Sequence, residues 1–215
     1  MKHIIAYEGK DKVALALMQE QYVPLFLPWV NWRIGVEGTL QRPPYSLNQG
    51  IEWVRSLDKA KGDHEVFAVL VRTNATKKSY RYVGHMGIHR LKWPDGIAGT
   101  GSILGAADAQ GKGIGTEAKL LILYHAFMVM GVRKLTSKVK SFNAQSAGHL
   151  IKCGYTFVGR YKNHQFHQGE YVDELLFELL REDWEPIWNE YQKTGILPRL
   201  TDRQRTDLKK MTGAS

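Results

Sequence analysis

The clearest chemical signal in the sequence is a run with three glycines at alternate positions. The run consists of Gln110, Gly111, Lys112, Gly113, Ile114, Gly115 and Thr116. Glycines lack the Cβ atoms that would keep a ligand at a distance, and they permit backbone angles at which successive N–H groups converge. A long apolar stretch follows, so a helix N-terminus adds unpaired N–H groups and the positive end of its dipole. The run therefore predicts a phosphate-binding loop.

Spacing excludes two common phosphate-binding loops. A Walker loop needs four residues between its first glycine and a Gly-Lys-Ser/Thr ending, but five residues separate Gly105 from Gly111, and Gly113 replaces the hydroxyl residue. A dinucleotide loop needs its third glycine one place beyond Gly115 and an acidic residue about 20 positions further on, where the region around Arg133 is basic. A turn that merely caps a helix stays open as an alternative on this run alone.

Two segments carry a family resemblance. Residues 110–118 resemble the acetyl-CoA pyrophosphate loop of the GNAT acetyltransferase superfamily, [Gln/Arg]-x-x-Gly-x-[Gly/Ala], with Gln110, Gly113 and Gly115 on the defined positions. Asn143 and Ser146, followed by residues 150–155, are similar to the N-x-x-S…E-K-x-G-F signature of the RimJ/RimL-like branch, which acetylates protein N-termini and small amines. The resemblance covers residues 4–188 and implies transfer of an acetyl group from acetyl-CoA to a primary amine by direct attack in a ternary complex.

The resemblance also implies which residues hold coenzyme A. Residues 110–116 bind the pyrophosphate, and Lys112 is expected to reach a phosphate unless it is a solvated surface lysine. In the family the strand before the loop pairs with the pantetheine arm, and this strand maps onto Ser102, Ile103 and Leu104. The family's equivalent of Asn143 hydrogen-bonds the pantetheine, although an asparagine at this place also suits a helix cap. No metal is expected.

The catalytic groups are less clear than the cofactor loop. Many family members use a glutamate on the strand before the loop as the base, but residues 99–103 contain no carboxylate. His85 and His89 lie four positions apart, so they share one face of a strand, and imidazole has a suitable pKa for a base. Either histidine could instead be structural. Ser146 could donate a proton to the leaving thiolate, or could only form part of the first turn of the helix that follows Asn143. Many family members use a tyrosine for this step, and Leu150 stands in its place.

Aromatic residues near the N-terminus are candidates for the acceptor side of the site. Trp29, Trp32 and Tyr45 fall where the resemblance places the acceptor cleft, although large aromatic side chains also serve as core. His164 and His167 have an H-x-x-H spacing with no further ligands around them, so we predict a hairpin turn there and not a metal site. The resemblance to the RimJ/RimL-like branch implies an amine-bearing small molecule or a protein N-terminus as the acceptor.

The pattern of apolar residues places these candidates on elements. A change to strand-like patterning at His64 predicts an antiparallel meander with turns near Asn74 and at 94–96, then a central helix over 116–130 closed by Gly131. The expected strands are 66–71, 80–88, 101–105, 135–141, 155–161 and 171–180, with a short helix over 144–152. This order predicts an α/β fold with a mixed, mostly antiparallel sheet flanked by helices, as in GNAT enzymes.

The two ends of the chain read as helical. Apolar spacing through Val13, Leu15, Leu17 and Met18 predicts a first helix, and residues 46–57 predict a second, with Ser46 as its N-cap. The segment from Asp183 onward is helical in composition. We expect an acyltransferase domain over 1–188 and a helical C-terminal extension over 189–215.

Composition bounds the partners. The chain has 30 Lys and Arg against 21 Asp and Glu, a formal charge of +9 that favours anionic partners. The basic residues are scattered, with concentrations near 133–140 and 199–210, which favours solvated faces. Two alternatives stay open: an RNA-borne amine, such as that of an aminoacyl-tRNA, as acceptor, and a non-catalytic acyl-CoA-binding module.

Compartment and assembly are less constrained. A run of 18 to 20 apolar residues, which a membrane span needs, is missing, as is a secretory signal. The single cysteine, Cys153, excludes an internal disulfide. We expect a cytoplasmic protein without membrane partners, and the sequence leaves a homodimer open.

Overall fold

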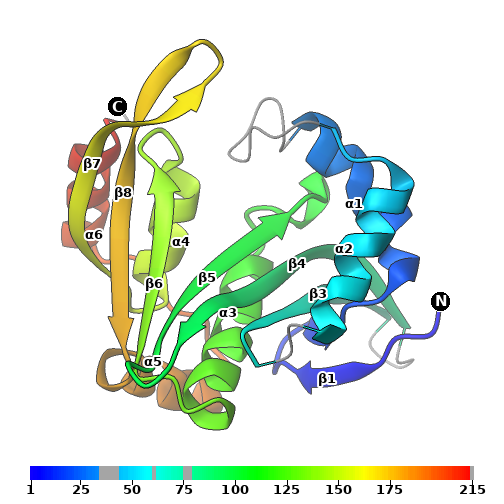
Figure 1. The fold of residues 1–215 in the computed structure, drawn as a ribbon. Helices are drawn as coiled ribbons and strands as arrows, with labels where there is room; N and C mark the ends of the chain where they lie inside the picture. Colours follow the sequence, from blue (N-terminus) through cyan, green and yellow to red (C-terminus); the bar gives the residue numbers. More distant parts are fainter. Residues whose placement is uncertain (34–43, 60–61, 75–78, 214–215) are drawn as a thin grey trace.

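The fold is built on one eight-stranded sheet (Figure 1). The computed structural model describes residues 1–33, 44–59, 62–74 and 79–213. The strands follow the order β1-β2-β3-β4-β5-β6-β8-β7, and every neighbouring pair is antiparallel except β5 and β6. Their bounds are β1 Ile5–Glu8, β2 Val13–Leu17, β3 His64–Asn74, β4 Ser79–Lys92, β5 Ile97–Leu104, β6 Lys134–Lys140, β7 Thr156–His167 and β8 Glu170–Leu180. The predicted mixed, mostly antiparallel sheet is confirmed.

The parallel pair divides the sheet. β5 and β6 are paired only over Ile97–Gly99 and Lys134–Thr136. Beyond these residues the two strands diverge, so that β1 to β5 and β6 to β8 form two halves joined at one end (Figure 1). From Thr100 onward, the edge of β5 that faces β6 is left without a neighbouring strand.

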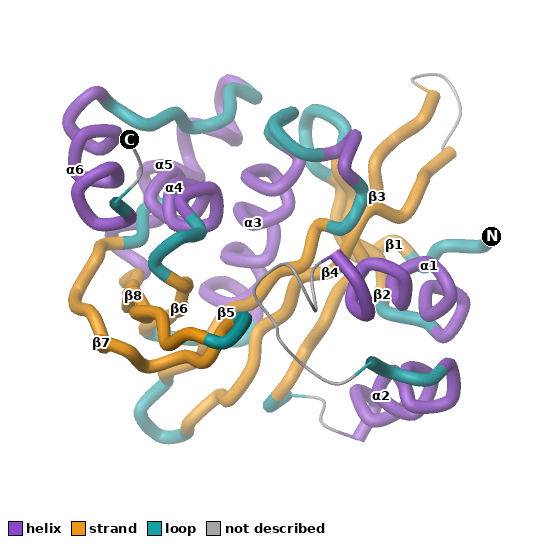
Figure 2. Tube along the Cα trace, turned by 90° about the horizontal axis from the view of Figure 1, so that it is seen from above, coloured by secondary structure: helices purple, strands orange, loops and turns teal. Residues whose placement is uncertain are grey.

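Helices cover both faces of the sheet (Figure 2). One face carries α3 (Ile114–Tyr124), which continues as a π-helical turn (His125–Val129), together with α4, α5 and α6. The other face carries α1 (Val23–Pro28) and α2 (Leu47–Lys59). Each layer has its own core, and nine residues of α3 are buried, so the expected central helix is confirmed.

The N-terminal prediction is wrong in one part. Residues 13–17 form strand β2 instead of a helix, and this strand lies between β1 and β3. Val13 and Leu15 enter the core beneath α3, while Ala14 and Ala16 enter the core beneath α1. A strand buried on both faces is a continuous apolar run, and periodicity does not separate such a run from a buried helix.

The second N-terminal helix is confirmed as α2. Its start is capped as expected, because the Gln49 N–H donates to Ser46 Oγ at 3.2 Å and the Gln49 side chain accepts from the Ser46 N–H at 2.8 Å. The predicted turn at 94–96 is present, with the Gly96 N–H donating to Lys92 O at 2.8 Å. The turn predicted after Asn74 falls mainly on 75–78, outside the described residues.

The C-terminal part of the chain forms two helices against the α3 face. α5 spans Arg181–Thr194 and α6 spans Asp202–Thr212, while α4 (Ala144–Lys152) lies between α6 and the sheet (Figure 2). Leu208 of α6 packs onto Gly148 of α4, where a Cβ would lie 3.0 Å from Leu208 Cδ2. α5 runs across residue 188, and the division of the chain there stays a prediction. Among the described residues, every helix is too short or too polar to cross a membrane.

Candidate active site

A cavity of about 430 Å³ opens where β5 and β6 diverge. Both halves of the sheet line it, together with α1, α2, α3 and α4. Seven residues singled out in the sequence lie on its wall: Tyr45, His85, His89, Ser102, Ile103, Asn143 and Ser146. Residues far apart in the chain are therefore gathered around one space, whereas Leu104 and the glycine loop 110–116 lie outside the wall of this cavity.

The glycine loop joins β5 to α3 in the conformation that its composition predicts. Gly111 and Gly113 have φ of 73° and 79°, the left-handed region that glycine adopts without strain, and Gly113 is the N-cap of α3. The Glu117 N–H donates to Gly113 O at 3.0 Å as the first bond of the helix. Within the described chain, the N–H groups of residues 114–116 thus have no acceptor inside the helix. The loop therefore fits a pyrophosphate.

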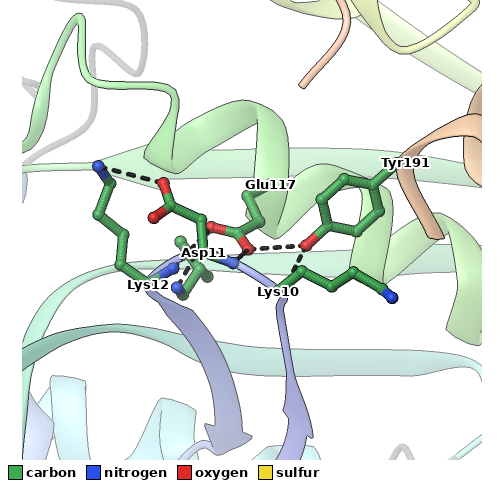
Figure 3. Close-up of polar contacts among 6 residues, drawn as sticks. Lys10, Asp11, Lys12, Glu117 and Tyr191 are labelled. Atoms are coloured by element: carbon green, nitrogen blue, oxygen red, sulfur yellow. Dashed lines mark hydrogen bonds and ion pairs between the residues drawn. The ribbon is translucent and has the colours of Figure 1, made fainter. Parts of the chain in front are cut away.

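A buried carboxylate holds the first turn of α3 in place (Figure 3). Glu117 is completely buried and accepts hydrogen bonds from the backbone N–H groups of Asp11, Lys12 and Val13 at 2.8 to 3.2 Å. The Tyr191 hydroxyl of α5 donates to the same carboxylate at 2.7 Å and accepts from the Lys10 N–H at 2.7 Å. Four donors thus tie the helix behind the loop to the β1–β2 turn and to the C-terminal part of the chain.

His85 of β4 lies on the same part of the cavity wall as Phe26 and Trp53. Its Nδ1 lies 2.8 Å from the Tyr82 hydroxyl, and its ring packs against Phe26 and Trp53, with centroids 5.4 Å away in each case. Burial lowers the pKa of His85 to about 4, so the imidazole is neutral at pH 7.

His89 shares the cavity face of β4 with His85 and reaches across β5. A Cβ at Gly99 would lie 2.6 Å from His89 Nε2, and one at Gly101 would lie 3.5 Å from its Cε1. The two glycines of β5 therefore make room for this ring on the strand where the family's carboxylate is missing. Burial, with lesser effects from His64, Arg90 and Lys119, lowers the pKa of His89 to about 4.

Asn143 and Ser146 lie at the start of α4. Asn143 Oδ1 accepts from the Ser146 N–H at 3.0 Å, so the asparagine is the helix cap. Within the described part of the chain, Asn143 Nδ2 has no hydrogen-bond partner, although the residue lines the cavity. Capping and a contact to a cavity ligand are therefore compatible roles for this side chain.

The three aromatic candidates are separated in the structure. Tyr45 lines the cavity. Trp29 instead stacks on Tyr82, with centroids 5.7 Å apart, and its indole fills the space that a side chain at Gly105 would need. Trp32 is 67% exposed. Trp53 of α2 also lines the cavity and was not among the site residues predicted from the sequence.

Charged residues on the cavity wall were also missed. Lys138 and Lys140 of β6 and Glu174 of β8 line it, and Lys138 Nζ lies 3.0 Å from Glu174 Oε2. The basic residues at 133–140 were interpreted as a solvated face, but Lys140 is only 7% exposed. Lys138 and Lys140 are alternate residues of β6, so their side chains point to the same face of the strand. The sequence could not identify them because it does not show which face of this strand borders the cavity.

Lys119 of α3 and His149 of α4 are two further groups whose polar contacts join elements around the site. Lys119 of α3 lines the cavity, and its Nζ donates to Thr100 Oγ1 at 3.1 Å. His149 of α4 has its Nε2 2.9 Å from Gly115 O, a contact that joins α4 to the first turn of α3.

His164 and His167 belong to strand β7, and the chain reverses after them at Gln168 and Gly169. The described residues contain no cluster of three His, Cys, Asp or Glu side chains suited to a metal.

Solved structures share this architecture. A spermidine N-acetyltransferase from Vibrio cholerae, in complex with CoA and spermine, superposes with a TM-score of 0.69 at 18% identity and covers 80% of this chain and 98% of its own. RimL, a ribosomal L7/L12 alpha-N-protein acetyltransferase in complex with coenzyme A, gives a TM-score of 0.69 at 17% identity and covers 80% of this chain and 96% of its own. At these identities the likeness shows the fold.

Sequence comparison goes further than the fold. A SPbeta prophage-derived uncharacterized N-acetyltransferase, YokL, from Bacillus subtilis strain 168 is 32% identical over 76 residues, which are 35% of this chain and 43% of that protein. The sequence profile of the acetyltransferase (GNAT) domain matches residues 8–156, from the end of β1 to the start of β7. The chain therefore belongs to the GNAT family of acyl-CoA-dependent N-acyltransferases.

Proposed function

We propose that the protein transfers an acetyl group from acetyl-CoA to the α-amine of a protein N-terminus or of a small molecule. The observation that carries the proposal is the cavity at the β5–β6 split, which has a glycine loop and a helix N-terminus beyond one end of β5 and two neutral histidines of β4 on its wall. Acetyl-CoA supplies the activated acetyl group as a thioester. The protein's own groups bind, orient and move protons.

The donor is held by backbone groups. The N–H groups of residues 111–116 and the positive end of α3 bind the pyrophosphate. Ser137 Oγ donates to Thr100 O at 3.1 Å, which places the Thr100 carbonyl on the β6 side of β5. Because polar groups alternate along a strand, Ser102 and Leu104 direct theirs to the same unpaired edge, where the amides of the pantetheine arm can pair with them. Asn143 Nδ2 adds a donor from the opposite side.

The acceptor is deprotonated by weak bases. His89, and His85 beside it, accept a hydrogen bond from the amine and take its proton as positive charge develops on the attacking nitrogen. Imidazoles with a pKa of about 4 are too weakly basic to take a proton from a free ammonium ion, so the amine must already be neutral when it binds. An α-amine with a pKa near 8 is partly neutral at pH 7, whereas a lysine amine near 10.4 is not, so the site favours an α-amine. Ser146 is proposed to give a proton to the departing sulfur.

A matched pair of peptides tests this function. One peptide has a free N-terminus, and the other has a blocked N-terminus and one lysine; each is incubated with the protein and acetyl-CoA while thiol release and peptide mass are followed. We expect acetylation of the free N-terminus at least tenfold faster than of the lysine. Tight CoA binding without turnover on these or on a polyamine and amino-acid panel would favour a non-catalytic module.

An RNA-borne amine is the alternative acceptor, motivated by an exposed basic surface on and before α6. Its members are Arg199, Arg203, Arg205, Lys209 and Lys210. An aminoacyl-tRNA acceptor predicts RNA affinity that falls steeply with salt. RNA affinity that is flat with salt, or absent, removes this alternative.

A further inference from the structure

Lys119 is a buried lysine that no role so far uses. Only 1% of its surface is exposed, yet it forms part of the cavity wall. An ammonium group carries three N–H donors. Across the described residues, the single hydrogen-bond partner of Lys119 Nζ is Thr100 Oγ1, at 3.1 Å, and the Tyr155 ring lies 5.8 Å away. Two donors of Lys119 therefore have no acceptor among the described residues.

The lysine also lacks a counter-charge. In the part of the chain that the structure describes, Lys119 takes part in no ion pair, in contrast to Lys138, which is paired with Glu174. Desolvation by burial lowers the pKa of Lys119 to about 8, so the ammonium form still dominates at pH 7. A buried cation without a partner is unfavourable in the free protein, and an anion placed beside it would relieve that cost.

The position of Lys119 identifies which part of a bound donor it meets. Thr100 is the first residue of β5 beyond the pairing with β6, so Lys119 lies at the closed end of the split. The glycine loop lies beyond the other end of β5. From Leu104 to Thr100 the strand rises about 13 Å. An arm that leaves the loop and follows this edge brings its sulfur end to the lysine.

We propose that Lys119 is a catalytic residue whose ammonium stabilises the negative charge that forms on the sulfur of coenzyme A. This inference rests on the proposed function. The attacking nitrogen forms the C–N bond and the electron pair of the C–S bond goes to sulfur, while the nitrogen's proton goes to an imidazole of the acceptor side. Lys119 donates a hydrogen bond to the sulfur throughout and keeps its own proton.

The test uses the thiol of coenzyme A itself, without any acceptor. The thiolate of bound coenzyme A is titrated by its ultraviolet absorbance, and a parallel titration with desulfo-coenzyme A subtracts the protein's own thiol, Cys153. We expect the bound thiol to have a pKa about one unit lower in the wild type than in Lys119→Met, since an opposite charge favours the thiolate. Lys152→Met, which removes a cation of α4 outside the cavity wall, should titrate like the wild type.

The outcomes separate this inference from the proposed function. Coenzyme A that binds with the same thiol pKa in the wild type and in Lys119→Met overturns the role of the lysine alone. A wild type that does not bind coenzyme A by calorimetry overturns both proposals. In turnover, Lys119→Met should lose about 10- to 100-fold in kcat with little change in the KM for acetyl-CoA. Lys119→Gln repeats the measurement if the methionine variant folds poorly.

Discussion

The parts of the site that we propose for the donor and for the acceptor are built from different groups. At the proposed donor end, the backbone N–H groups of residues 111–116, which lie outside the cavity wall, and the open edge of β5 are available to coenzyme A. At the proposed acceptor end, side chains from α1, α2, β4, β6 and β8 line the cavity. Backbone groups serve any donor with the same pyrophosphate and arm, whereas a wall of side chains can change with the acceptor. Under the proposed function, the donor end therefore provides what all acetyl-CoA-dependent members need, and the acceptor end determines which amine this protein accepts.

Breaking the donor end should have the largest effect. Gly113→Leu places a side chain at a φ of 79°, where its Cβ would lie 2.7 Å from Leu197 Cδ1. We expect coenzyme A affinity to fall by at least about 100-fold, because strain and bulk both disturb the anion-binding turn. Isothermal calorimetry with coenzyme A measures this loss.

Gly131→Ala is the matched control for the loop. Gly131 also has a positive φ, 69°, but it lies after the other end of the same helix and no atom is within 4 Å of a Cβ there. Its substitution should lower stability slightly and leave coenzyme A affinity unchanged. Equal losses of affinity in both variants would mean that general destabilisation, and not the loop, determines binding.

The support behind the loop gives the next effect. Glu117→Gln replaces a carboxylate with an amide that cannot accept all four hydrogen bonds, and it leaves buried donors unpaired. We expect a loss of about 2 to 4 kcal/mol in the free energy of unfolding, measured by urea denaturation. Tyr191→Phe removes one of the four donors to Glu117 together with the acceptor of the Lys10 N–H, and should cost about 1.5 kcal/mol. A Glu117→Gln variant as stable as Tyr191→Phe would contradict the central role of the carboxylate.

The same contrast explains what could be predicted from sequence. The loop was recognisable because its three glycines fall within five consecutive residues, so the whole pattern lies in one short segment of the sequence. The β2 strand was mistaken for a helix because both of its faces are buried. The close approach of His89 to Gly99 depends on the pairing of two strands, so a pattern within one segment of the sequence could not predict it. The position of Lys119 on the cavity wall could not be predicted, because the residue lies in an apolar helix and the sequence does not show which face of that helix borders the cavity.

At the acceptor end, acid should destabilise the protein through the buried histidines. The pKa of His85 is lowered to about 4 from 6.5, so the unfolded chain binds more protons between these values. Stability from this group is complete above about pH 6.5 and declines as the pH falls toward 4, with a loss of about 2 kcal/mol by pH 5. Urea denaturation at several pH values measures this slope. His85→Gln should flatten it, and an unchanged slope in that variant would assign the acid sensitivity to other groups.

The smallest expected effect comes from a variant that displaces the His89 imidazole without replacing the histidine. Gly99→Ala puts a methyl group 2.6 Å from His89 Nε2, so the ring must shift away from β5. If His89 is the base, kcat should fall about 10-fold while coenzyme A affinity is retained, since a displaced base loses its hydrogen-bond geometry. Gly101→Ala meets the same ring at an ordinary 3.5 Å and should cost less than about threefold. Equal activities in the two variants would shift the assignment of the base to His85, because β5 would then have no part in placing it.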